Sequence, residues 1–309
     1  MKNIDTSVFV GKLEFKNPLI AASGTFGYGL EFEKILDLNA IGGFCTKGLS
    51  LSPREGNPPP RIHETHGGML NSIGLHNIGV KAFIADKLPK LKKYNTHIIA
   101  NVYGETFEEF EEVVRILSDE AGISALEINV SCPNVKKGGL DLGTNPQKVF
   151  ELLKRLRLVT SKPLWAKLTP NVTDILELSK SAIDAGADAL VLINSVRALS
   201  LNWKTNEPHL YTNFGGLTGP AIKPIALGKV FEVAKHFSIP IVGVGGICNA
   251  HDVMDFIVAG ASAVEIGTQN FIKTTSMTDI ACDLEKLLQE NSIDRLSAYK
   301  GKIHHKTIL

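Results

Sequence analysis

The chain has 309 residues, 44% of them hydrophobic and 21% charged, and its formal net charge is +1. This is the composition of a globular protein, and so small a charge gives no electrostatic reason to expect nucleic acid or an acidic membrane as a partner. No apolar run approaches the roughly 20 residues of a membrane span, and the amino terminus lacks the apolar segment of a signal peptide. We therefore expect one cytoplasmic domain over residues 1–309.

The sequence shows no metal-binding pattern. Its four cysteines, Cys45, Cys132, Cys248 and Cys282, lie far apart, and its nine histidines do not cluster. Without a C-x-x-C pair the cysteines predict neither a structural zinc site nor an iron–sulfur cluster. Isolated thiols suit a reducing compartment. We expect no metal ion on this chain.

The first predicted element is a hairpin over residues 7–16, an alternating stretch with a Gly-Lys turn. Eight short apolar runs follow, and their near-continuous hydrophobicity is typical of parallel strands that are covered on both faces. The predicted strands occupy residues 18–23, 41–47, 97–103, 125–131, 163–169, 189–195, 240–246 and 263–268.

Helical patterns separate most of these strands. Thr106 and Glu109 form a capping box, apolar residues recur at helical spacing over 107–117, 149–156 and 175–182, and Gly186 is placed to end a helix. Eight alternating strands and helices predict an α/β fold, the (β/α)8 TIM barrel, with a doubly wound sheet as the second possibility. Two long connections, 49–96 and 196–220, are expected to cover the carboxyl-terminal rim.

Polar residues or glycines end all eight predicted strands, which packing alone would not require. In a TIM barrel these ends meet at one rim, where the site is built. The residues are Ser23, Thr46, Lys47, Asn101, residues 129–134, Lys167, Asn194, Ser195, Gly245, Gly246, Gly267 and Thr268.

The end of the fourth predicted strand brings together a thiol, a hydroxyl and two amides. Cys132 lies between Asn129 and Asn134, and Pro133 prevents the strand from continuing. A thiolate at this position could act as a base or a nucleophile. The alternative is a small buried apolar residue, the usual role of a free cysteine.

Glycines follow the seventh and eighth predicted strands. Gly245, Gly246 and Gly267 would let backbone N–H groups approach a phosphate, and these two loops are the usual phosphate site of a TIM barrel. Tight packing at the turns is the alternative. Residues 215–220 are expected to form a further glycine-rich loop. A dinucleotide is not expected, because no G-x-G-x-x-G follows a first strand.

Two lysines and a set of amides suggest the kind of ligand. Lys47 and Lys167 lie in otherwise apolar strands, where an unpaired charge is costly. Each could contact an electron-rich ring or a phosphate, and a Schiff base at Lys167 is the competing role. Amides at Asn71, Asn129, Asn134 and Asn194 suit a planar ring with alternating C=O and N–H groups, such as a pyrimidine. Turn-forming asparagines are the alternative.

These residues resemble the class 1 dihydroorotate dehydrogenases. The resemblance runs from about residue 18 to 268 and rests on segments 46–48, 71–75, 129–134, 167–171, 194–195 and 215–220. It implies an FMN-binding (β/α)8 barrel that oxidises dihydroorotate to orotate in pyrimidine (UMP) biosynthesis. Class 1 has a cysteine base where the membrane-linked class 2 has a serine, and Cys132 occupies that position.

Further segments resemble subclass 1B. They are residues 60–65 with 68–71, and residues 135–139 with 143–146. That subclass passes electrons to NAD through a second subunit that carries FAD and a [2Fe–2S] cluster. The resemblance therefore implies that a homodimer of this chain forms the core of a heterotetramer.

The resemblance also implies residue roles. Cys132 would take a proton from C5 of dihydroorotate while a hydride passes from C6 to N5 of FMN. The residues implied to hold FMN are Ser23, Lys47, Gly48, Asn101, Asn129, Lys167, Ile193, Gly219, Gly245, Gly246, Gly267 and Thr268. Those implied to hold the pyrimidine and its carboxylate are Lys47, Asn71, Ser72, Ile73, Gly74, Leu75, Asn129, Asn134, Asn194 and Ser195.

Three other functions compete with this one. A dihydropyrimidine dehydrogenase-like reductase would share the barrel, FMN and a cysteine, but such chains usually carry ferredoxin-type cysteine clusters. A flavin-free lyase would use Lys167 as a Schiff base. A non-catalytic binding barrel would tolerate the loss of the Cys132 thiol.

Overall fold

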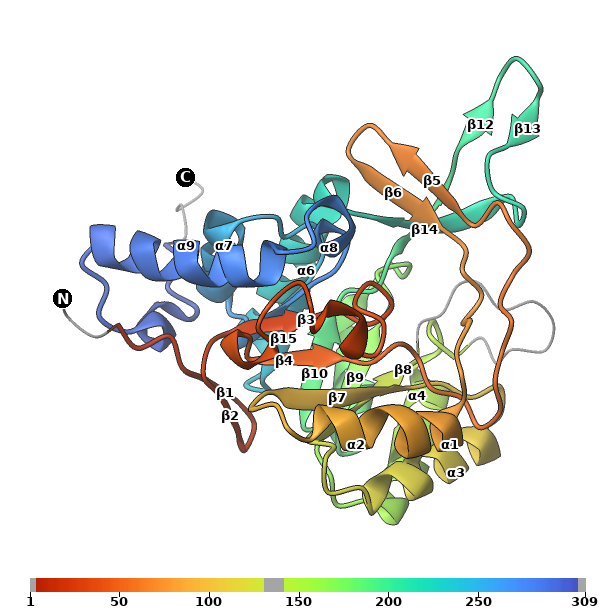
Figure 1. Ribbon diagram of the computed structural model, residues 1–309, viewed down its shortest axis with the longest axis horizontal. Coiled ribbons are helices and arrows are strands. Elements are labelled where there is room, and N and C mark those ends of the chain that lie inside the picture. Colours follow the sequence, from red (N-terminus) through yellow and green to blue (C-terminus); the bar gives the residue numbers. More distant parts are fainter. Residues whose placement is uncertain (1–3, 131–141, 305–309) are drawn as a thin grey trace.

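Eight parallel strands form a closed barrel in the computed structural model, which describes residues 4–130 and 142–304 (Figure 1). Each strand pairs with the next barrel strand in sequence, and β16 pairs with β3 to close the ring. The barrel strands are β3 (Leu19–Ala21), β4 (Gly43–Cys45), β7 (His97–Val102), β8 (Ala125–Asn129), β9 (Leu164–Leu168), β10 (Ala189–Leu192), β15 (Ile241–Val244) and β16 (Ala263–Ile266). The predicted (β/α)8 barrel is confirmed.

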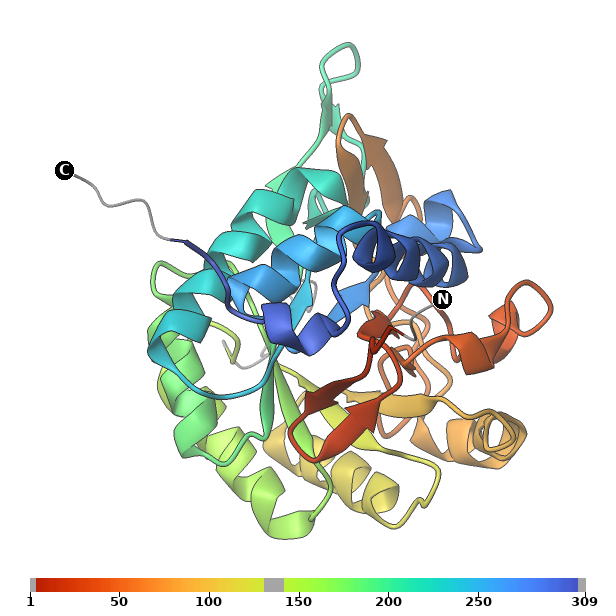
Figure 2. The ribbon, with the colours of Figure 1, turned by 90° about the vertical axis from the view of Figure 1, so that its left-hand side faces the viewer.

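Helices surround the strands (Figure 2). The α-helices are α1 (Val80–Ala82), α2 (Leu88–Leu91), α3 (Phe107–Ser118), α4 (Pro146–Val159), α5 (Ile175–Asp184), α6 (Lys223–His236), α7 (Ala250–Ala259), α8 (Gln269–Ile272) and α9 (Ser276–Glu290). A π-helical turn, Phe83–Lys87, lies between α1 and α2, and 3₁₀ turns lie at Leu30–Phe32, Leu38–Ala40, Pro220–Ile222 and Leu296–Tyr299.

The helix boundaries follow the predicted capping signals. The Thr106 side chain accepts a hydrogen bond from the Glu109 N–H at 3.2 Å, and the Glu109 carboxylate accepts one from the Glu105 N–H at 2.8 Å. These bonds satisfy donors that would otherwise be unpaired at the start of α3. Gly186, with φ of 98°, follows α5 and returns its N–H to the Ile183 carbonyl. The start of α3 and the end of α5 are therefore set by local hydrogen bonds.

The amino-terminal hairpin lies at the end of the barrel where the strands begin. Its strands are β1 (Val8–Val10) and β2 (Leu13–Phe15), paired antiparallel. Phe15 is fully buried, and its ring centroid lies 4.4 Å from that of His97 and 6.1 Å from that of Trp165. The ring therefore closes the amino-terminal end of the core.

The two long connections fold together into a second sheet beyond the opposite end of the barrel (Figure 1). Its strand order is β11-β14-β6-β5, and a two-stranded extension, β12 with β13, projects from it. The strands are β5 (Ile62–Thr65), β6 (Gly68–Asn71), β11 (Val196–Leu199), β12 (Leu201–Asn202), β13 (Glu207–Pro208) and β14 (Phe214–Thr218). The glycine-rich loop predicted at 215–220 is thus wrong for residues 215–218, which belong to β14.

Within the described residues, none of the helices has both the length and the apolar character that crossing a membrane would require.

Candidate active site

A cavity of about 450 Å³ lies between the carboxyl-terminal rim of the barrel and the second sheet. Every barrel strand supplies at least one lining residue, at its end or directly after it. One from each strand, in order, gives Ser23, Lys47, Asn101, Asn129, Lys167, Ile193, Gly245 and Gly267. The convergence of eight strand ends explains how residues so far apart in sequence meet at one site.

Most residues predicted to bind a ligand line this one cavity. They include every residue expected to contact FMN, together with Asn71, Ile73, Gly74, Leu75, Asn194 and Ser195. Ser72 is the exception among the described residues, because it is fully buried and does not line the cavity. Cys132 and Asn134 lie outside the described residues, so their roles stay predictions.

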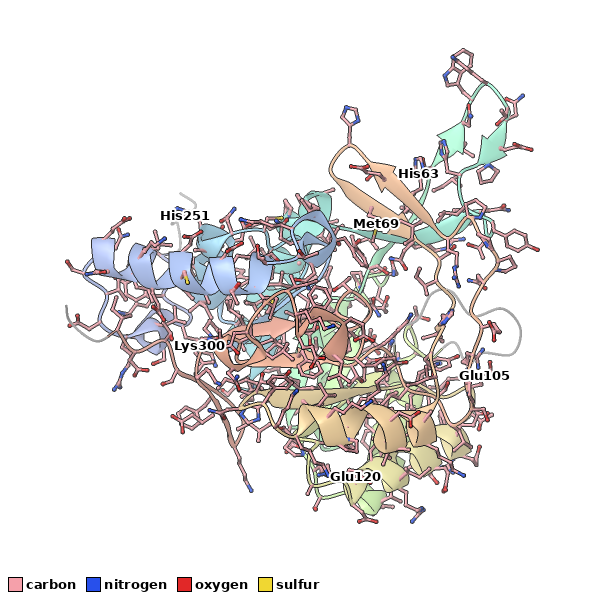
Figure 3. The ribbon with its side chains drawn as sticks, viewed as in Figure 1. His63, Met69, Glu105, Glu120, His251 and Lys300 are labelled. Atoms are coloured by element: carbon pink, nitrogen blue, oxygen red, sulfur yellow. The ribbon has the colours of Figure 1, made fainter. Side chains whose placement is uncertain are left out.

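The second sheet forms the opposite wall of the cavity. In β6, Met69 and Asn71 line the cavity whereas Leu70, between them, is buried, as the alternation of side chains along a strand requires. Figure 3 shows Met69 and His63 on the hairpin β5–β6. His63 does not line the cavity; its ring stacks on that of His209 with centroids 3.8 Å apart.

The loops after β15 and β16 bring backbone close to the cavity. Gly246 has φ of 75°, and a Cβ there would lie 2.7 Å from the Lys223 Cβ and 2.9 Å from the Gly219 carbonyl oxygen. No larger residue fits this position, since both the conformation and the space require glycine. The Thr268 hydroxyl donates to that of Thr218 at 2.8 Å, which joins this rim to the second sheet.

A buried polar atom without a hydrogen-bond partner lies on a residue of the cavity wall. Asn101 is 1% exposed, lines the cavity, and has no hydrogen-bond partner for its Oδ1 within the described residues. Its Nδ2 donates to Glu127, which fixes the orientation of the amide. A buried acceptor without a donor is costly, so a ligand N–H at this point would be favourable.

A buried ion cluster lies in the barrel interior behind the cavity. The Lys167 ammonium lies 3.2 Å from Glu127 Oε1 and 2.7 Å from Glu265 Oε2, and the two carboxylate side chains are 0% exposed. The Cys45 thiol donates to Glu265 Oε1 at 3.2 Å and lies 3.6 Å from Glu127 Oε2. The Cys45 sulfur and one carboxylate oxygen each of Glu127 and Glu265 lie within 4.8 Å of one another. The positive charge beside these groups is the Lys167 ammonium.

The members of this cluster set each other's protonation. Burial alone would lower the pKa of Lys167, but the two carboxylates hold it above its ordinary value. Burial would raise the pKa of Glu127, yet Lys167 and hydrogen bonds keep it below its ordinary value. Burial and the charge of Glu127 raise the pKa of Glu265 to about 8. Burial and both carboxylates raise the pKa of the Cys45 thiol. Lys167 is therefore a fixed positive charge.

A second cation lies at the cavity. Lys47 follows β4 and lines the cavity, and its backbone N–H donates to the Gly27 carbonyl at 2.8 Å. Burial lowers the pKa of Lys47, and the positive charge of Arg61 adds to this effect. An anionic ligand would relieve both costs, because it would return a counter-charge to a partly desolvated ammonium.

Amide groups at the cavity are held in place by hydrogen bonds. Asn71 Nδ2 donates to the Gly216 carbonyl at 3.2 Å, and Asn194 Nδ2 donates to Asn129 Oδ1 at 3.3 Å. Asn194 Oδ1 also accepts from the Ser195 N–H at 2.8 Å. Amides fixed in this way present donors and acceptors to a planar polar ligand without further ordering, which lowers the entropic cost of binding.

Sequence reasoning missed the buried carboxylates of the cluster. Glu127 and Glu265 lie within two of the apolar runs that the sequence predicts to be buried strands. A charged residue inside each run was the available signal, because an unpaired carboxylate in a parallel barrel strand is costly. Thr25, His76 and Cys248 also line the cavity and were not predicted.

Close packing explains the glycines of β14. A Cβ on Gly216 would lie 2.1 Å from Ser195 Oγ and 2.6 Å from Ser195 Cβ, and one on Gly215 would lie 2.7 Å from the Asn71 carbonyl oxygen. Gly216 therefore lets the second sheet approach Ser195 at the rim, and Gly215 lets β14 pack closely against Asn71 of β6.

Gly216→Ala should therefore lower the free energy of unfolding by about 1–3 kcal/mol, the usual cost of overpacking. Gly228→Ala is the matched control, because in the described part of the chain nothing lies within 4 Å of its Cβ position in α6. Alanine in a helix interior should add about 0.5–1 kcal/mol there. Urea unfolding of both variants measures the difference, and equal stability changes would contradict this account of β14.

A parallel barrel with this kind of site at its carboxyl-terminal rim places the chain among the (β/α)8-barrel enzymes. A sequence model of the dihydroorotate dehydrogenase family matches residues 6–288. The chain therefore belongs to the dihydroorotate dehydrogenase family.

Curated relatives resemble the chain over almost its entire length. The dihydroorotate dehydrogenase B (NAD(+)) catalytic subunit of Geobacter sp. (strain M21) is 47% identical, over 98% of this chain and 99% of its own. The protein of the same name from Thermodesulfovibrio yellowstonii is 48% identical, over 95% of this chain and 97% of its own. A relative from Solibacter usitatus, 48% identical over 94% of this chain and 96% of its own, is provisionally named dihydroorotate dehydrogenase A (fumarate).

Proposed function

We propose that this chain is the FMN-binding catalytic subunit of an NAD-dependent dihydroorotate dehydrogenase, which oxidises (S)-dihydroorotate to orotate in pyrimidine biosynthesis. The observation that carries the proposal is the cavity, in which a fixed cation, a glycine-lined edge and a buried acceptor without a partner among the described residues meet. The family match and the relatives' names support the same activity.

The cavity residues fit FMN by their chemistry. Gly245, Gly246 and Gly267 would offer backbone N–H groups to the phosphate, and Asn101 Oδ1 would accept from the ring system. Lys167 would place its positive charge beside the electron-rich ring. When bound, FMN supplies the acceptor for the hydride that leaves C6 of dihydroorotate.

The remaining groups would handle the substrate. Cys132 would remove the C5 proton, a role that needs only a positioned thiolate. Asn71, Asn129 and Asn194 would hold the pyrimidine amides, and Lys47 would pair with the carboxylate. Burial and the positive charge of Arg61 disfavour the charged form of Lys47. A bound carboxylate would stabilise that charged form, so the ion pair with Lys47 should strengthen binding of the substrate.

The electron acceptor is proposed to be NAD, reached through a partner subunit with FAD and a [2Fe–2S] cluster. Two of the relatives described above carry NAD(+) and "catalytic subunit" in their names. The described cysteines support a cluster on another chain, since Cys45 is inside the barrel, Cys248 beside the cavity and Cys282 on α9. We further propose a cytoplasmic heterotetramer around a homodimer of this chain.

The Schiff-base lyase is disfavoured by the buried cluster. A lysine must be neutral to attack a carbonyl, whereas Glu127 and Glu265 raise the pKa of Lys167 and keep it charged. The dihydropyrimidine reductase remains the second candidate, because it would use the same barrel and cofactor.

Anaerobic mixing of the purified chain with dihydroorotate tests the proposal. We expect a visible flavin band that dihydroorotate bleaches rapidly and dihydrouracil does not. Bleaching by dihydrouracil alone would point to the reductase, and a chain that binds no FMN would refute the cofactor assignment. Reoxidation by NAD only with the co-expressed partner subunit, and not by fumarate, would support the acceptor; direct reoxidation by fumarate would contradict it.

A further inference from the structure

The buried cluster behind the cavity contains one more carboxyl group than is needed to neutralise the charge of Lys167. Two carboxylates, Glu127 and Glu265, face a single ammonium, and all of these groups are almost completely removed from solvent. A net negative charge in such an interior is costly, so one carboxyl group should retain a proton at neutral pH. The raised pKa of Glu265, about 8, is consistent with this count.

Glu127 lies on β8 and Glu265 on β16, and the described groups that face this pair come from three other barrel strands. Lys167 of β9 pairs with both carboxylates, Cys45 of β4 contacts both, and Asn101 of β7 donates to Glu127. Lys167 and Asn101 also line the cavity, whereas Glu127 and Glu265 do not. The two carboxylates therefore act on a ligand only through these neighbours and through their charge.

We propose that Glu127 and Glu265 are positioning residues that share one proton behind the cavity and thereby set how strongly the site favours reduced over oxidised flavin. This inference rests on the proposed function for its flavin readout. Below about pH 8 the cluster holds one ammonium, one carboxylate and one carboxylic acid, and its net charge is zero. Above that pH the proton leaves to solvent, the net charge becomes −1, and a reduced, anionic flavin is disfavoured.

Amide substitutions test the shared proton. Glu265→Gln keeps the neutral-pH charge and removes the titration, so its flavin midpoint potential should equal that of the unsubstituted chain at about pH 6.5 and exceed it at about pH 9.5. At the higher pH we expect the ratio of reduced to oxidised flavin affinity to differ about tenfold, which corresponds to one pKa unit of coupling. Glu127→Gln should also remove the change in midpoint potential that the unsubstituted chain shows near pH 8, because the remaining carboxylate then pairs alone with Lys167.

Glu111→Gln is the matched control, since Glu111 pairs with Arg155 on the outside of the barrel. Its potential should follow that of the unsubstituted chain at every pH. A difference in midpoint potential between Glu265→Gln and the unsubstituted chain that stays constant from about pH 6 to 9.5 would overturn the inference. A constant difference would indicate a merely structural displacement, which acts at every pH.

Unfolding of the flavin-free protein gives a second readout. The pKa of Glu265 is raised from 4.5 to about 8 in the folded protein. The contribution of this group to the stability of the fold is therefore fully present below pH 4.5 and is lost as the pH rises to about 8. The Tm of Glu265→Gln relative to the unsubstituted chain should therefore increase between those values and then level off. A constant Tm difference would refute the shared proton. Failure of the proposed function is separate, since it would appear as a chain that binds no FMN.

Discussion

Lys167→Met should lower the free energy of unfolding by about 3–5 kcal/mol, the cost of removing one partner from a buried ion pair. Methionine approximates the length of the lysine side chain but leaves Glu127 and Glu265 without the ammonium that lies 3.2 Å and 2.7 Å from them. Because Lys167 lowers the pKa of Glu127, its loss should leave that pKa above the ordinary value of 4.5, so the variant should become less stable relative to the unsubstituted chain as the pH rises above 4.5. Urea unfolding at several pH values measures both effects.

Lys180→Met is the control for this substitution. Lys180 pairs with Asp184 on the surface of α5 with its side chain 65% exposed, and such pairs contribute about 0–1 kcal/mol. Similar decreases in the free energy of unfolding for the two variants would show that the buried ion pairs of Lys167 stabilise the fold no more than a surface pair does. Under the proposed function, Lys167→Met should also be purified with little FMN, because the cavity loses its fixed positive charge.

Cys132→Ser should leave FMN bound and slow its reduction by dihydroorotate about 10²–10⁴-fold at neutral pH, the usual contribution of general-base catalysis. A serine hydroxyl has a far higher pKa than a thiol, so almost none of it is ionised near pH 7. The rate should recover as the pH is raised, because ionisation of the hydroxyl increases.

Stopped-flow absorbance of the flavin band under anaerobic conditions measures this reduction. Cys282→Ser is the matched control, because Cys282 is exposed on α9, outside the cavity, and its loss should leave the rate unchanged. Equal rates for Cys132→Ser and the unsubstituted chain would remove Cys132 from the mechanism.

The sequence predicted the barrel closely because local rules dominate there. Each of the eight predicted runs contains a barrel strand that is one to four residues shorter than the run, as in residues 41–47 against β4 (Gly43–Cys45). Thr106, Glu109 and Gly186 mark helix ends through hydrogen bonds to nearby backbone, so short-range sequence is sufficient to find them.

The second sheet was not predicted because its strands depend on partners far away in the sequence. Asn71 bonds to Gly216, 145 residues further along the chain, and the glycines of β14 look like a turn when they are considered alone. Their actual role is to allow close approach of Ser195 and Asn71, a requirement that exists only when the two long connections meet.

The sequence by itself determined the barrel, the rim and the residues that gather there, since period, strand ends and glycine positions are local properties. Only the tertiary structure decided the charge state of the site. Lys167 meets Glu127 and Glu265 across 40 and 98 residues of chain, and their protonation depends on mutual distance and exclusion of water. These quantities belong to the closed barrel, because no single strand contains more than one of the three ionisable groups.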